Sequence, residues 1–228
     1  MTHPELHVLR VFTAPDGTGG NQLGVFLNGS RVAPDERQEV AARLGFSETV
    51  FVDDALRGEV RIFTPAVELP LAGHPLVGTA WLLGREVGSP EVLRPPAGQV
   101  PTWEQEGVTW IRADPGWAPD FELRELESPV AVDRLPAPPR GARLLDAWAW
   151  LDETAGLVRS RVFPPALGID EDEATGAAAL RLGAALDRPI TIRQGRGSEI
   201  FARPGPGGTV EIGGRVEMVE TRPRAVQG

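Results

Sequence analysis

A strand-like pentapeptide occurs once in each half of this chain, as RIFTP at 61–65 and as RVFPP at 161–165. Each copy is followed by a short loop with acidic residues, then by Ala-Gly-His at 72–74 or Ala-Thr-Gly at 174–176, and then by an apolar segment. A strand, a loop and a helix at matching places in both halves indicate a duplicated domain pair. A chance match of five residues is the alternative, which the matching context disfavours.

Each half is expected to contain one central helix. The segment PLVGTAWLL at 75–83 is apolar on nearly every side, which is typical of a helix that is buried all round. We therefore predict one helix at about 73–84 and its counterpart at about 175–186. Segments with the alternating pattern of strands surround both, among them LHVLRVFT, QLGVFLNG, FSETVFVDD, LVRSRVFPP and PITIRQG. The pattern favours strands curled around one helix in each half.

A Pro/Gly-rich stretch, RPPAGQVP at 94–101, interrupts these patterns and reads as a linker. It predicts an N-terminal barrel-like domain over 1–96 and a C-terminal barrel-like domain over 97–228. A chain of 228 residues is long enough for two such domains.

The amino-acid composition excludes several classes of partner and of catalytic chemistry. The net charge of −9 argues against nucleic acid as a partner. Lysine and cysteine are absent, which excludes lysine Schiff bases, disulfides and thiolate catalysis. No apolar run approaches the roughly 20 residues of a membrane span, and MTHPELHVLR leads directly into a strand-like pattern. We expect no membrane partner, no secretory signal and a cytoplasmic location.

Three polar residues stand at places where chemistry is expected. Glu48 begins the strand in FSETVFV, and alternation puts it on the face of Val50 and Val52, so that this face either lines a cleft or buries a charge. His74 lies at the start of the first central helix, and Asp172 lies in DEDEATG before the second. Each has a plain structural alternative: a strand-edge glutamate, a packed histidine, and an aspartate that caps the helix or belongs to a solvated run of charges ahead of it.

The two helix starts are candidate anion sites. Unpaired backbone N–H groups and the helix dipole favour a carboxylate there. Gly73 and Gly176 let a ligand approach these amides closely, and the Gly-rich turn at 17–21 offers further amides. That turn lacks the Gly-Lys-Ser/Thr ending of a P-loop and the spacing of a dinucleotide fingerprint, so nucleotide binding is disfavoured. If both starts face one cleft between the domains, a small carboxylated metabolite fits there.

The motifs SETVFV, RIFTPAVELPLAGHPLVGTAWLL and GIDEDEATGAAA resemble those of the PhzF-type phenazine biosynthesis family. The Gly-Gly-Asn turn and the late IRQGRGSEIFA segment also fit, so the resemblance spans nearly the whole chain. It implies the α+β diaminopimelate-epimerase-like fold: two similar domains, each a curled, mostly antiparallel sheet or barrel around a central helix. It further implies a homodimer that isomerises its substrate without cofactor or metal.

The resemblance also implies roles for individual residues. It makes Glu48 the general acid/base, with His74 and Asp172 holding the substrate and assisting proton transfer. The residues implied to bind substrate are Asn21, Gly73, Gly176 and Ala177.

Two positions depart from the family pattern. Glu173 stands where the family usually has proline, and Ala177 where it usually has serine; the chain is also a shortened member. Loss of the serine donor removes a hydrogen bond worth about 0.5–1.5 kcal/mol, so the ligand is expected to differ. The sequence favours a cofactor-independent isomerase. A non-catalytic organic-acid binding protein is the alternative, and a dimeric scaffold is a weaker one.

Overall fold

The computed structural model describes residues 5–223 and divides the chain into two compact units. Unit 1 comprises the chain up to Val11, Asn21–Ile111 and the chain from Val216 on, and unit 2 comprises Phe12–Gly20 and Arg112–Arg215. This differs from the single boundary expected at 96/97, because each unit is discontinuous. The outermost residues of the two expected domains, 1–4 and 224–228, lie outside the described part.

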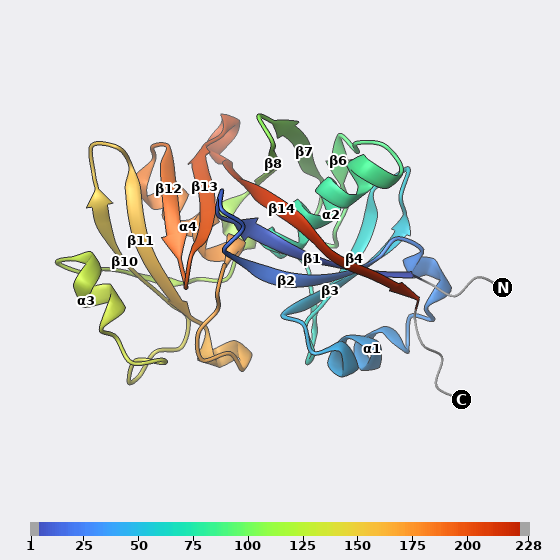
Figure 1. Cartoon of the computed structure of the whole chain (residues 1–228), viewed down its shortest axis with the longest axis horizontal. Coiled ribbons are helices and arrows are strands. Elements are labelled where there is room, and N and C mark those ends of the chain that lie inside the picture. Colours follow the sequence, from blue (N-terminus) through green and yellow to red (C-terminus); the bar gives the residue numbers. More distant parts are fainter. Residues whose placement is uncertain (1–4, 224–228) are drawn as a thin grey trace. The chain divides into compact units, whose positions relative to one another are not determined.

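The elements follow the sequence patterns closely (Figure 1). The α-helices are α1 (Arg37–Leu44), α2 (Gly73–Glu86), α3 (Pro129–Asp133) and α4 (Gly176–Leu186). The strands of the first half are β1 (Glu5–Thr13), β2 (Gly19–Phe26), β3 (Glu48–Asp54), β4 (Glu59–Phe63), β5 (Glu68–Leu69), β6 (Val92–Leu93), β7 (Val100–Gln105) and β8 (Val108–Ala113). Those of the second half are β9 (Glu122–Glu125), β10 (Leu145–Asp152), β11 (Leu157–Phe163), β12 (Ile190–Gln194), β13 (Ser198–Pro204) and β14 (Val210–Pro223).

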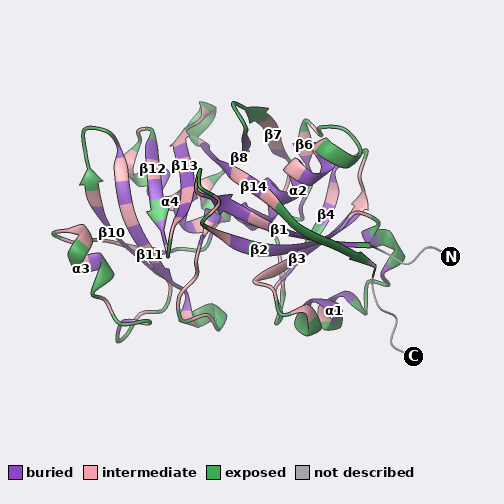
Figure 2. Ribbon diagram, in the orientation of Figure 1, coloured by how far each residue is buried: buried purple, intermediate pink, exposed green. Residues whose placement is uncertain are grey.

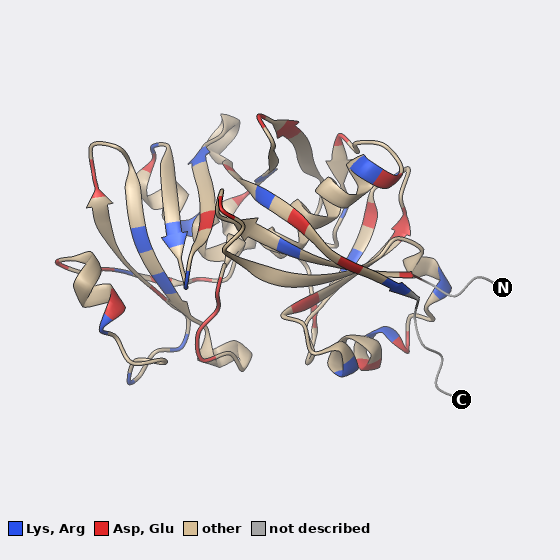
Figure 3. Cartoon of the chain, viewed as in Figure 1, with Lys and Arg blue, Asp and Glu red and all other residues tan. Residues whose placement is uncertain are grey.

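In unit 1 the strand order is β5-β4-β3-β2-β1-β14, and β8, β7 and β6 continue from β14. β2 and β3 are parallel, whereas β3, β4 and β5 are antiparallel. β1 and β14 are hydrogen-bonded neighbours, and an ion pair joins them, with Arg10 Nη2 2.6 Å from Glu217 Oε2. Figure 3 shows bands of charged residues along both strands.

The helix α2 is the centre of unit 1. Every residue from Gly73 to Ala80 is buried, and only the C-terminal end is exposed (Figure 2). A Cβ at Gly78 would lie 2.6 Å from Leu23 and 2.7 Å from Val11, so the helix presses against β2 and β1. The helix also contacts β3 and β7. A helix that touches strands from both parts of the sheet requires that sheet to curl around it. No helix within residues 5–223 is long and apolar enough to cross a membrane.

The opposite face of the β1–β4 sheet is covered by α1. An aromatic group packs beneath α1: Phe51 stacks on Phe26, with ring centroids 5.2 Å apart, and meets Phe63 edge-on. Because successive strand residues point to opposite faces, Glu48, Val50 and Val52 of β3 point to the α2 face. The packing of α1 on one face of the sheet and α2 on the other thus determines which side chains of β3 can belong to an active site beside α2.

Unit 2 has the strand order β14-β13-β12-β11-β10-β9. Its central helix is α4. A Cβ at Gly183 would lie 3.0 Å from Val210 on β14 and 3.2 Å from Ala202 on β13. At the other end of α4, Ala178 packs with Val162 of β11. The second unit therefore repeats the plan of the first: a sheet wrapped on one apolar helix.

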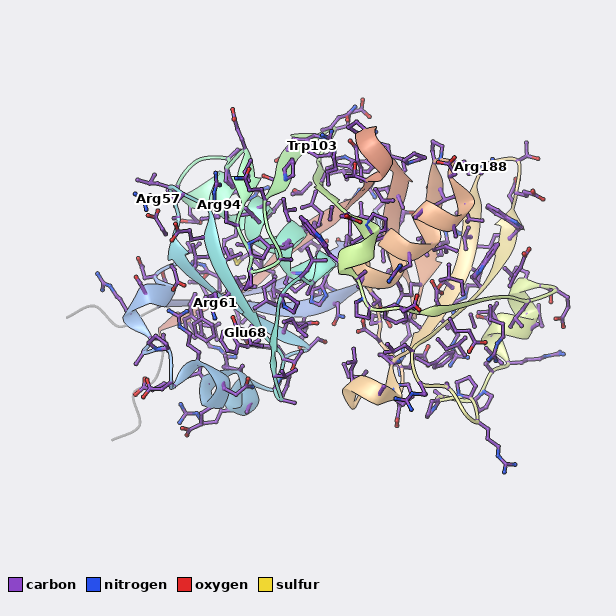
Figure 4. The ribbon with its side chains drawn as sticks, turned by 180° about the vertical axis from the view of Figure 1, so that it is seen from behind. Arg57, Arg61, Glu68, Arg94, Trp103 and Arg188 are labelled. Atoms are coloured by element: carbon purple, nitrogen blue, oxygen red, sulfur yellow. The ribbon has the colours of Figure 1, made fainter. Side chains whose placement is uncertain are left out.

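The repeated pentapeptides occupy equivalent places in the two units. Ile62 of RIFTP pairs with Leu69, three residues before the N-cap of α2, and Val162 of RVFPP pairs with Asp172, three residues before the N-cap of α4. The arginine that opens each pentapeptide forms a two-pronged ion pair with a glutamate in the following loop. These pairs are Arg61–Glu68, labelled in Figure 4, and Arg161–Glu171. The sequence echo is therefore a structural repeat.

Some elements carried no clear sequence signal. The stretch expected to be a linker lies inside unit 1, and β7 begins within it at Val100 and pairs with β6 and β8. β9 and α3 have short and irregular patterns and were not expected. The helix α3 is explained by local chemistry, because the Ser128 hydroxyl caps it by accepting from Ala131 N, and proline follows at the first helical position.

Candidate active site

The first group of candidate residues lies in unit 1, where β2, β3 and α2 meet. Glu48 opens β3 and pairs with Leu23 of the parallel strand β2. Its side chain points to the α2 face and retains only 14% of its exposure. A strand-edge glutamate in solvent, the plain structural alternative, would be far more exposed. The charge is instead placed next to the start of the buried helix.

His74 stands at the second position of α2, directly beside Glu48. The two side chains approach through Nε2 of His74 and Oε2 of Glu48, which lie 3.2 Å apart. His74 Nε2 is fully buried and makes no aligned hydrogen bond to a residue within 5–223. Burial lowers the pKa of His74 to about 3, opposed by a hydrogen bond to the Gln22 backbone. The positive end of the helix dipole acts in the same direction as burial. The imidazole is therefore neutral at pH 7.

Asn21 is held beside this pair by the motif that contains Glu48. The Ser47 hydroxyl donates to Asn21 Oδ1 at 2.9 Å, and Asn21 itself is buried. Since Gln22 contacts His74 through its backbone, two successive residues of β2 support the group from one side. Neither Ser47 nor Gln22 was predicted from the sequence. A signal for Ser47 was present in the sequence, because it is the serine of S-E-T immediately before Glu48.

The second group lies in unit 2, ahead of α4. Asp172 is fixed by its backbone, because Asp172 N donates to Val162 O at 2.9 Å, and by the Thr175 hydroxyl, which donates to Asp172 Oδ2 at 2.6 Å. The N-cap of α4 is Thr175. Asp172 is therefore not the N-cap of α4, and its role towards a substrate stays a prediction.

Both central helices begin without a capping side chain. The N-cap of α2 is Ala72 and that of α4 is Thr175, and neither side chain makes a cap hydrogen bond. Gly73 and Gly176 are the first helical residues, as expected. Ala177 follows with its side chain partly exposed next to the Phe121 cluster. First-turn amides that no cap satisfies are suited to binding an anion.

Glu173, which replaces the family's proline, has a defined structural role. Its carboxylate accepts from Arg196 N at 2.8 Å and from the Ser198 hydroxyl at 2.9 Å. Ser198 in turn accepts from Gly20 N at 2.8 Å. The substitution thus ties the loop before α4 to the turn between β12 and β13.

Glu48, His74, Asn21 and Gly73 come together in unit 1, and Asp172, Gly176 and Ala177 come together in unit 2. Sharing of one substrate by the two groups stays a prediction. Within residues 5–223, no three His, Asp or Glu side chains are grouped in a way that could hold a metal ion. Gln194 is an unpredicted member of the second group; it donates to Thr175 Oγ1 and to the Asp172 carbonyl. The sequence shows only the alternation Ile-x-Ile-x-Gln, which places Gln194 on the same face as two isoleucines but does not show that it is buried.

Comparison with known proteins identifies the family of this chain. The family described as "Phenazine biosynthesis-like protein" (PhzC-PhzF) matches residues 9–114. A trans-2,3-dihydro-3-hydroxyanthranilate isomerase from Pseudomonas aeruginosa is 31% identical over 250 residues, covering 91% of this chain and 89% of the relative.

Two solved structures show the fold. A phenazine biosynthesis PhzC/PhzF protein from Clostridium difficile superposes with a TM-score of 0.81 at 19% identity, covering 98% of this chain and all of that one. A hydroxyproline epimerase from Agrobacterium vitis reaches 0.59 at 12% identity, covering 97% of this chain and 91% of that one. These likenesses confirm the predicted α+β class with two similar curled-sheet domains. The chain belongs to the phenazine biosynthesis-like family and is an isomerase.

Proposed function

We propose that this isomerase moves a proton on a small carboxylated metabolite without a cofactor, with Glu48 as the general acid/base. The observation that carries the proposal is the approach of His74 Nε2 to Glu48 Oε2 at 3.2 Å in a site closed to solvent. Catalytic hydrogen bonds are often poorly aligned before substrate binds and tighten afterwards. A buried imidazole nitrogen without an aligned partner fits that state.

The chemistry divides between the two side chains. His74 is neutral at pH 7, so it can hold or orient a substrate through a hydrogen bond without carrying charge. Glu48 is then the group of the pair that gains and loses the proton. In a dry site a carboxyl group can deliver a proton to one carbon and accept one from another within a single substrate. Cysteine-based racemisation is excluded, because the chain contains no cysteine.

The relatives named trans-2,3-dihydro-3-hydroxyanthranilate isomerase make that acid the first compound to test. Part of the same proposal is that Asp172 holds the substrate and that Gly73, Gly176 and Ala177 offer amides to its carboxylate. The alanine at 177 favours a ligand that does not need the missing hydroxyl. The homodimer and the cytoplasmic location also remain predictions, which sedimentation and cell fractionation check.

The decisive experiment follows isomerisation in deuterated water by NMR. Glu48→Gln is expected to lower the rate by about 10²- to 10⁴-fold, the usual contribution of general acid–base catalysis, while ligand affinity is kept. Glu68→Gln is the matched control: it changes a glutamate of unit 1 that pairs with Arg61 outside the site, and its activity should equal that of the wild type. Equal deuterium incorporation by Glu48→Gln and Glu68→Gln would refute the role of Glu48. Binding without exchange in the wild type would instead support the organic-acid binding protein.

A further inference from the structure

A buried glutamine ends the strand β12 of unit 2. Ile190, Ile192 and Gln194 share one face of that strand, and all three are buried, with Gln194 only 1% exposed. Gln194 pairs in register with Ser160 of β11, two residues before Val162. Since Val162 packs on α4, the side chain of Gln194 lies on the face of the sheet that α4 covers.

Every polar atom of this amide is used. Gln194 Nε2 donates to the Asp172 carbonyl and to Thr175 Oγ1, each at 2.9 Å. Gln194 Oε1 accepts from Thr175 N at 3.1 Å. A backbone N–H can only donate, so the oxygen of the amide must face Thr175 N and the nitrogen must face the other two groups. The orientation of the side chain is therefore unambiguous.

This orientation determines which group accepts a hydrogen bond from the Thr175 hydroxyl. The hydroxyl has one proton, and it already accepts from Gln194 Nε2. Its own donation goes to Asp172 Oδ2 at 2.6 Å. Thr175 is the N-cap of α4, where a threonine oxygen ordinarily accepts from a first-turn amide, yet no such bond is formed. The residue is used to hold Asp172 in place of capping its own helix.

We propose that Gln194 is a positioning residue that acts through the Thr175 hydroxyl to fix the rotamer and the charged state of Asp172. The proposal rests on the proposed function, because it takes Asp172 to be the residue that holds the substrate. A donor aimed at one carboxylate oxygen locks the side chain and stabilises its ionised form.

The acidic residues near Asp172 in the sequence and in the sheet have partners of their own. Glu171 is paired with Arg161, and Glu173 is bound by Ser198 and by a backbone amide. Asp146 pairs in register with Val162, as Asp172 does, and its carboxylate accepts from a different hydroxyl, that of Ser160. Removing the Thr175 donor therefore leaves these pairs unchanged.

The hydrogen bonds from Gln194 to the Thr175 hydroxyl and from that hydroxyl to Asp172 form a relay. The test uses two variants, each of which removes one member of this relay. Thr175→Val removes only the hydroxyl and keeps the shape, and Gln194→Met removes the amide at nearly the same size. Thr209→Val is the matched control, since it removes a threonine hydroxyl of unit 2 that donates to Pro206 O and changes no charge. The readout is the ¹³C carboxyl titration of the full chain labelled at aspartate, with the Asp172 signal assigned by its loss in Asp172→Asn.

We expect the midpoint of the Asp172 titration to rise by roughly one pH unit in Thr175→Val, because the ionised form loses its hydroxyl donor. In Gln194→Met the hydroxyl remains but is no longer held in place by the amide, so the rise should be smaller. The acidic limb of the kcat/KM profile for trans-2,3-dihydro-3-hydroxyanthranilate should move to higher pH by the same amount as the midpoint of each variant, whereas Thr209→Val should match the wild type. An unchanged Asp172 midpoint in Thr175→Val overturns the proposal. If Gln194→Met does not fold, Thr175→Val decides alone.

The two readouts separate this proposal from the proposed function. If the Asp172 midpoint shifts in Thr175→Val but the wild type does not isomerise the acid, the relay is supported and the proposed function is not. If the midpoint does not shift in Thr175→Val and the wild type is active, the relay is refuted and the proposed function is retained.

Discussion

Asp146 is expected to make the protein less stable at neutral pH than at acid pH. This aspartate of β10 is 1% exposed, and the Ser160 hydroxyl donates to its Oδ1 at 2.6 Å. Burial raises its pKa from 3.8 to about 6, and the Ser160 bond partly opposes that rise. The folded state therefore binds more protons than the unfolded state between these two values. The contribution of Asp146 to stability falls as pH rises from about 4 to 6 and stays lower above it.

The size of the effect follows from the shift. A difference of about 2 units corresponds to about 3 kcal/mol, at 1.36 kcal/mol per unit. Asp146→Asn does not titrate and keeps an oxygen that can accept from Ser160. Its gain in unfolding free energy over the wild type should therefore be about 3 kcal/mol larger at pH 8 than at pH 4. Comparing the two pH values cancels any fixed cost of the new amide.

Urea denaturation of both proteins at pH 4, 6 and 8, followed by circular dichroism, measures this difference. Ser160→Ala is the companion variant: it removes a donor to a charged acceptor, so it should cost more at pH 8 than at pH 4. A gain for Asp146→Asn that is the same at pH 4 and pH 8 would show that Asp146 is ionised equally in both states and refute the reasoning.

Three further predictions concern stability. Burial lowers the pKa of His74 to about 3, so the unfolded state gains a proton at higher pH than the folded state does. In urea titrations the unfolding free energy of the wild type should therefore fall, relative to His74→Gln, by up to about 1.4 kcal/mol per pH unit below pH 6.5. Gly78→Val should lower the unfolding free energy by about 1–3 kcal/mol in the same assay, because even its Cβ meets Leu23 at 2.6 Å. Glu171→Gln should cost about 1.5–3 kcal/mol, because it removes the charged acceptor of Arg161, which is only 11% exposed and keeps three backbone carbonyl acceptors. Glu68→Gln, whose arginine is 47% exposed, should cost less than about 1 kcal/mol in thermal unfolding.

The fold was largely predictable, because its strongest signals are periodic and repeated. The apolar segment that became α2 and the alternating segments that became β3 and β11 depend on local patterns, and the structure has them within a few residues of the expected bounds. The short strands β6 and β9 were not predictable, since two to four residues give no period to read. Their conformation depends on pairing with distant partners.

The candidate site was predictable as a set of residues but not as a set of contacts. The motifs around Glu48 and His74 named both residues, yet only the packing of α2 on β3 brings their side chains together. Gln194 could not be assigned from the chain alone, because a glutamine at the end of a strand is ordinarily exposed. Its role depends on the register between β11 and β12, which a sequence does not display.

The discontinuous units have a consequence for the order in which this protein can fold. β1 lies between β2 and β14, and the part of β14 from Val216 on belongs to unit 1. As a nascent chain emerges, β1 keeps a bare hydrogen-bonding edge until that last strand has been synthesised. Neither half can therefore mature on the ribosome by itself. A fragment ending at Ile111 would expose that edge permanently, and we expect it to aggregate where the full chain stays dispersed.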